Sequence, residues 1–172
     1  SATVQTPAGA TINVPANDGG DSSLNLTVGA ENKLELDGGY GDGIYTVTIN
    51  AVNDGTQTIA LNISGDTYPS TPRISNLLAG RAIDGASNFT LTWDAFVGGT
   101  ANDIIMVEVQ QSSGNGGSDV FSSPSPGEPG QLTGLNSSVV IPAGSMAAGG
   151  EFDVTIRFIR PTAMTTQYAS GL

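Results

Sequence analysis

The chain has 172 residues, no cysteine, no histidine and a net charge of −11, from sixteen acidic and five basic residues. The missing residue types exclude a disulfide framework, thiolate and imidazole metal sites, and Ser-His-Asp or Cys-His catalysis. Five positive charges cannot form a basic face and no run approaches the ~20 apolar residues of a membrane span, so nucleic acid and membrane insertion are not expected.

The first half alternates apolar and polar residues, which is the period of a β-strand with one buried face. We expect short edge strands within residues 3–14, a strand over 24–28 and a short partner at 34–36. Stronger strands follow at 45–49 and 59–63, joined by a hairpin turn through Asn53, Asp54 and Gly55.

Two glycine-rich turns in this half carry acidic residues. Asp18 and Asp21 lie in one, and Asp37 and Asp42 flank the other, which also holds Tyr40. Carboxylates on flexible backbone suit calcium, so all four are candidate ligands, although the same residues also serve tight turns without any metal. Tyr40 is the candidate platform for stacking on a sugar ring.

The stretch Tyr68–Pro72 contains two prolines and predicts a short, stiff connector. It divides the chain into a first unit over residues 1–68, a linker over 69–72 and a second unit over 73–172.

The second half shows clear strand patterns at 89–93, 103–110, 138–141 and 151–159, with a short strand at 119–121 inside a polar connection. No stretch of ten or more residues shows a helical period, so the chain is predicted to be all-β. Alternate residues of three of these strands form the predicted core, led by the single tryptophan: Phe89, Leu91, Trp93, Ile105, Val107, Val109, Phe152, Val154, Ile156 and Phe158.

Three further apolar residues, Ile104, Met106 and Ile159, fall on the opposite face of these strands. A strand that is apolar on both faces is usually covered on both. These residues therefore predict either a protein-docking patch or packing against the first unit.

Residues 89–94, ending in Trp93 and Asp94, resemble the second strand of fibronectin type III-like domains, and residues 141–154 look like the corner before the sixth strand of that family. Phe152 stands where the family usually has a tyrosine. In the first half, residues 42–47 are similar to a strand start of bacterial immunoglobulin-like modules, in which Tyr45 could form the tyrosine corner. The resemblance implies two immunoglobulin/fibronectin III-like antiparallel β-sandwich units in tandem, and a non-catalytic spacer, adhesive or carbohydrate-associated role.

A sandwich of this type needs a seventh strand after Phe158, but only the polar residues 161–172 follow. They could form a weak final strand, the first unit could cover the edge, the sequence could stop short, or a neighbouring subunit could supply the strand.

The abundance of Gly, Ser, Thr and Asn, with one lysine, is typical of a secreted, extracellular or cell-surface protein. We therefore expect a structural or adhesive module, such as a spacer, surface-layer element or fibre subunit, that self-associates through a strand edge or apolar patch as a homo-oligomer or fibre. The alternative is a carbohydrate-binding accessory module of a secreted enzyme, with polysaccharide as its partner. An enzyme is not expected, because the mid-strand acids Glu108 and Asp153 face outward, and no cofactor is expected other than the candidate calcium.

Overall fold

The computed structural model describes residues 1–16, 24–65, 68–112 and 117–163. It divides into two compact units, Ser1–Asp66 with Thr162–Leu172, and Thr67–Pro161. The division falls next to the predicted connector, whereas the predicted second unit ran on to residue 172. Each unit is described by itself below.

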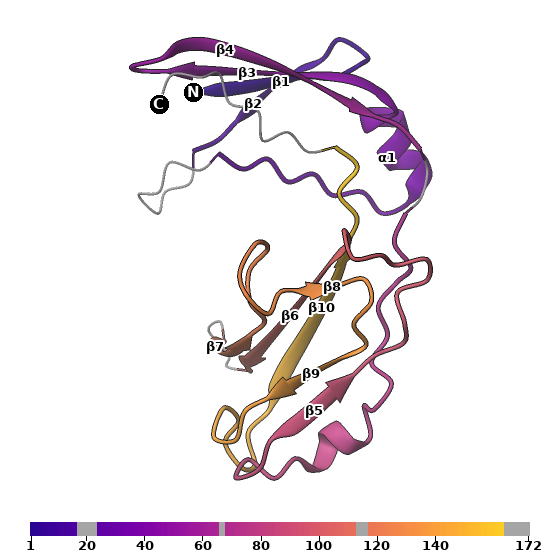
Figure 1. The fold of residues 1–172 in the computed structure, drawn as a ribbon, viewed down its shortest axis with the longest axis vertical. Helices are drawn as coiled ribbons and strands as arrows, with labels where there is room; N and C mark the ends of the chain where they lie inside the picture. Colours follow the sequence, from indigo (N-terminus) through magenta and orange to yellow (C-terminus); the bar gives the residue numbers. More distant parts are fainter. Residues whose placement is uncertain (17–23, 66–67, 113–116, 164–172) are drawn as a thin grey trace. The chain divides into compact units, whose positions relative to one another are not determined.

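The first unit contains one four-stranded antiparallel sheet in the order β2-β1-β3-β4 (Figure 1). Its strands are β1 (Ala2–Gln5), β2 (Thr11–Val14), β3 (Gly43–Ala51) and β4 (Gly55–Ile63). The predicted strands within 3–14, 45–49 and 59–63 are thus confirmed.

The register of this sheet separates apolar from polar side chains. Val4 lies between Ile12 and Val47, while on the other face Thr48 lies between Thr3 and Thr58. Successive strand residues point to opposite faces, so the alternation read from the sequence becomes one apolar and one threonine-rich face.

Tyr45 is the main buried side chain of this sheet. Among the described residues of the first unit only Ala2 and Tyr45 are buried hydrophobics. The Tyr45 hydroxyl donates to the Gly41 carbonyl at 2.9 Å, so the predicted corner hydrogen bond is confirmed, and burial raises the pKa of that hydroxyl.

Two strand predictions in this unit are wrong. The stretch that contains Leu34 and Leu36 is the α-helix α1 (Lys33–Tyr40), and of residues 24–28 only Leu24 forms a bridge, with Ala16. Local capping explains the helix: the Asn32 side chain accepts from the Glu35 amide at 3.0 Å, and the Glu35 carboxylate accepts from the Glu31 amide at 2.9 Å.

The second unit places two antiparallel sheets around one core (Figure 1). One sheet has the order β10-β6-β7, with β8 also paired to β6, and the other pairs β5 with β9. The strands are β5 (Phe89–Thr92), β6 (Ile104–Gln111), β7 (Ser118–Ser122), β8 (Leu132–Thr133), β9 (Ser138–Ile141) and β10 (Phe152–Ile159), with a short 3-10 helix η1 (Ala79–Ala82) before β5.

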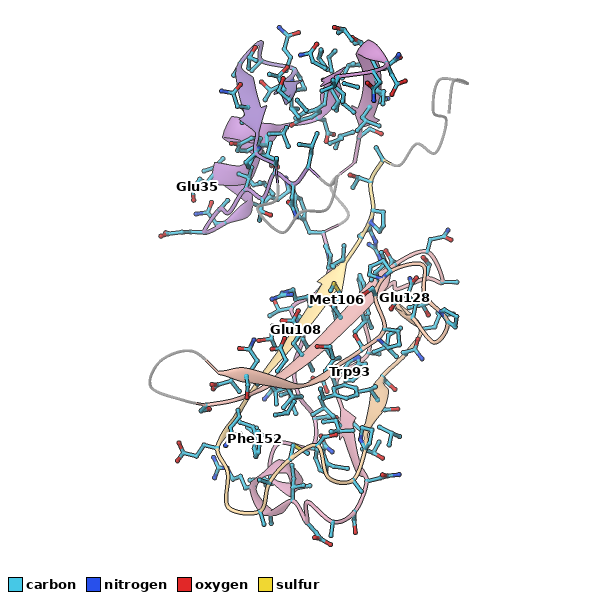
Figure 2. The ribbon with its side chains drawn as sticks, turned by 90° about the vertical axis from the view of Figure 1, so that its left-hand side faces the viewer. Glu35, Trp93, Met106, Glu108, Glu128 and Phe152 are labelled. Carbon is cyan, nitrogen blue, oxygen red and sulfur yellow. The ribbon has the colours of Figure 1, made fainter. Side chains whose placement is uncertain are left out.

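The predicted core of this unit is confirmed for its central members. Trp93 is 3% exposed and its indole donates to the Asn136 carbonyl at 3.1 Å (Figure 2). Ile105, Val107 and Val109 on β6 are fully buried. The apolar residues of β10 are only half-buried, because β10 lies at the end of its sheet.

The β-rich class is therefore confirmed, with α1 and η1 as additions. The first half differs from the sandwich predicted for it, because its described strands form a single sheet. No helix in the described residues has the length and hydrophobicity needed to cross a membrane.

Candidate functional site

The outer edge of β10 is open in the described part of the chain. β10 pairs with β6 along its whole length, from Phe152 opposite Gln111 to Ile159 opposite Ile104, and the described residues place no strand on its other side. An open edge presents a row of backbone donors and acceptors to any chain that can lie beside it.

The orientation of these backbone groups follows from one hydrogen bond. The Ser112 amide donates to the Glu151 carbonyl at 2.8 Å, which continues the β10–β6 ladder. In an antiparallel ladder, residue pairs that exchange backbone hydrogen bonds alternate with pairs whose N–H and C=O groups point away from the partner strand. The N–H and C=O groups that point outward from β10 are therefore those of its inward-facing residues, namely Phe152, Val154, Ile156 and Phe158.

A groove runs beside this edge, and apolar side chains line most of its larger section. Its main section has a volume of about 380 Å³, and a neighbouring section of about 290 Å³ lies between Pro72, Ile74 and residues 154–156. The main section is lined chiefly by apolar side chains of the segment before β5, of both sheets and of the β9–β10 turn: Ile74, Leu77, Ile83, Phe89, Leu91, Ile141, Met146, Phe152 and Val154.

The wall of the groove opposite β10 is held by backbone hydrogen bonds to β5 and the residues after it. The Ser75 amide donates to the Thr92 carbonyl at 3.0 Å, and the Asp94 amide donates to the Arg73 carbonyl at 2.9 Å. Ile74 forms an isolated bridge with Trp93. The groove is therefore bounded on both sides by ordered backbone.

A buried ion pair anchors the end of β10. Arg160 Nε lies 2.8 Å from Asp103 Oδ1, and the Thr100 amide and hydroxyl donate to Asp103 Oδ2 at 2.7 and 2.9 Å. The Arg160 hydrogen bond is the main cause that lowers the pKa of Asp103 to about 2. Arg160 also lies 5.0 Å from the centroid of the Phe96 ring, which stacks on Phe158 at 4.7 Å.

This ion pair was not predicted from the sequence. Two signals for it are present in the sequence: Asp103 stands at the start of the β6 pattern, and Arg160 directly follows the β10 pattern. Their pairing nevertheless depends on the antiparallel register of β6 with β10, which sequence spacing does not reveal.

The two mid-strand acids lie on the outward face, as predicted. Glu108 accepts a hydrogen bond from Arg157 at 2.9 Å, and Asp153 accepts one from Ser112 at 2.8 Å (Figure 2 labels Glu108). Each carboxylate thus has its own partner on the sheet surface.

The four candidate calcium ligands do not form one cluster in the described residues. Asp37 pairs with Lys33 one turn back in α1, and Asp42 accepts from the Gly65 amide at 2.9 Å. Asp18 and Asp21 lie outside the described residues. Nowhere in the described ranges do three or more acidic side chains gather to hold a metal ion.

Tyr40, the candidate sugar platform, is the last residue of α1 and is half-buried. The helix replaces residues 37–40 of the predicted glycine-rich turn, so the Tyr40 ring is presented by the end of a helix.

The three candidate interface residues do lie together. Ile104 is opposite Ile159 in the β6–β10 register, and Met106 follows two residues later on the same face of β6 (Figure 2). All three are half-buried, and the Arg157–Glu108 ion pair lies next along the same face.

Comparison of the chain with protein-family models, with curated proteins and with solved structures finds no match in any of the three.

Proposed function

We propose that the protein is a non-catalytic extracellular structural or adhesive module that binds other protein chains by strand addition at β10. In this proposal the second unit is a fibronectin type III-like sandwich in which the added strand takes the position next to β10. The observation that carries the proposal is the coincidence of an open strand edge with an apolar groove along the same residues, Phe152–Ile156.

Strand addition needs two features that this edge combines. Backbone hydrogen bonds to the outward N–H and C=O groups supply affinity, and pockets for alternate side chains supply specificity. The groove lies on the core side of the sheet, where every second residue of an added strand would point. An added strand with apolar residues at alternate positions would therefore complete both the sheet and the core.

The proposal is tested with a nine-residue peptide of alternating valine and threonine, flanked by lysines for solubility. We expect it to bind the chain and to protect the outward amides of β10 from hydrogen exchange, measured residue by residue by NMR.

Val154→Pro removes one outward donor without touching the ladder to β6, because proline is tolerated on the solvent side of an edge strand. We expect it to abolish peptide binding.

The matched control is Val140→Pro on β9. The Trp93 amide donates to the Ser137 carbonyl, so by alternation the Val140 amide also points away from its partner strand, β5. This variant should bind the peptide like the parent chain. Equal binding by Val154→Pro, or no binding by the parent, would overturn the proposal.

A further inference from the structure

We infer that the strand added at β10 is β10 of a second copy of this chain, in an antiparallel register centred on Thr155. The inference rests on the proposed function and goes beyond it, because it identifies the partner and gives a closed dimer with two-fold symmetry.

The geometry of β10 restricts how two copies can pair. Residues directly opposite each other in an antiparallel pair share a face of the sheet, so inward residues must meet inward residues. Centring the pair on Thr155 satisfies this condition. It places Phe152 opposite Phe158 and Val154 opposite Ile156, and these four residues carry the outward backbone groups.

The same register brings opposite charges together on the outer face. Asp153 of each copy lies opposite Arg157 of the other, so the dimer contains this pair twice. Both residues are exposed. Arg157 also contacts Glu108, but its side chain is 52% exposed, and a guanidinium has five donors and can serve two carboxylates.

Neighbouring registers match less completely. A centre on Ile156 places Asp153 opposite Ile159, and Arg157 opposite Thr155. A centre on Val154 keeps one opposite-charge pair, Arg157 with Glu151, but moves Asp153 opposite Thr155 and leaves Phe158 opposite a glycine of the β9–β10 turn. Among these three registers, only the one centred on Thr155 places every apolar residue of 152–158 opposite an apolar residue and both charged residues opposite a residue of opposite charge.

The inward apolar side chains of the two copies would lie side by side along the groove, on the core face of the joined sheet. Phe158 of the second copy would lie beside Phe152 and its Ile156 beside Val154, the two β10 residues that line the 380 Å³ section. Both copies use the same strand in the contact, so the interface is isologous and the assembly is complete as a dimer. Opposite charges at this contact also offset the repulsion between two chains of net charge −11.

A charge-swap series measured by analytical ultracentrifugation of the full chain tests the register. We expect the parent chain to dimerise and Asp153→Arg or Arg157→Asp to weaken the dimer about tenfold, since each places like charges opposite each other at two positions. The double variant D153R/R157D should restore dimerisation to within about threefold of the parent. Asp119→Arg on β7, the strand at the opposite end of the sheet from β10, is the matched control and should not change the dimer.

Trp93 fluorescence checks that every variant is folded, so a loss of dimer is separated from a loss of structure. A parent chain that stays monomeric at about 100 μM would overturn the inference. The inference would also be overturned if both single variants still dimerised like the parent chain, or if the double variant did not regain dimerisation. If the chain is monomeric yet binds the valine–threonine peptide, the proposed function stands and the second copy is excluded as the partner.

Discussion

The two units start from the same strand pattern and reach different degrees of burial. Nine buried hydrophobic residues form the core of the second unit, whereas in the first unit the described residues include two, Ala2 and Tyr45. The difference lies in the second layer. In the second unit β5 and β9 cover the sheet formed by β6, β7 and β10, but the described part of the first unit has one sheet and a helix whose residues are not buried. Alternation of apolar and polar residues produces a strand with one apolar face. A buried core forms only where a second layer of secondary structure packs on that face.

The largest expected effect comes from removing the centre of the larger core. Trp93→Ala should destabilise the second unit by about 4 kcal/mol, because it leaves a large cavity and removes the donor to the Asn136 carbonyl. Urea denaturation followed by circular dichroism measures the loss. Val140→Ala at a half-exposed site of the same unit should change the free energy of unfolding by less than about 0.5 kcal/mol. A comparable loss in both variants would remove the distinction between core and surface on which the comparison depends.

The buried ion pair gives the next largest effect and a pH signature confined to the second unit. Asp103→Asn should cost about 2 kcal/mol, because a neutral amide replaces the carboxylate that accepts hydrogen bonds from Arg160 and Thr100. Trp93 fluorescence reports this unit alone, since it is the only tryptophan.

The pH dependence follows from the lowered pKa of Asp103. A carboxylate with a folded-state pKa of about 2 and an ordinary value of 3.8 contributes its full stabilisation above 3.8 and loses it as the pH falls toward 2. The stability difference between the parent and Asp103→Asn should therefore shrink over that interval. A difference that is constant from neutral pH to pH 2 would contradict the assigned role.

The smallest effect concerns the first unit. Tyr45→Phe keeps the ring but removes the hydrogen bond to the Gly41 carbonyl, and should destabilise this unit by about 1 kcal/mol. Amide hydrogen exchange of β3 and β4 measures it without interference from the second unit. If the exchange of these strands does not change, the corner bond contributes nothing and the unit depends on its sheet alone.

Alternating sequence patterns were sufficient to predict those strands that bury one face. The alternation around Trp93, through Ile105–Val109 and through Phe152–Phe158 predicted β5, β6 and β10 and the central members of the core, but not the buried residues Phe96, Leu132, Ile141 and Met146. Alternation also predicted β3, whereas the corner hydrogen bond of Tyr45 was expected from the resemblance of residues 42–47 to bacterial immunoglobulin-like modules. The helix α1 was missed because two leucines two residues apart look like a strand, while the competing signal, Asn32 followed by Glu35, acts through two capping hydrogen bonds.

The sequence by itself determined which residues alternate, which residue types are absent and where the strongest strands lie. Only the tertiary structure decided that β10 lies at the end of its sheet, that Asp103 meets Arg160, and that the segment from Pro72 to Ile83 forms the far wall of a groove. The physical reason is that strand order and register depend on contacts between residues tens of positions apart. Such contacts depend on which strand faces can be buried against each other. The alternation of apolar and polar residues does not reveal them, because it is the same in a central strand and in an edge strand.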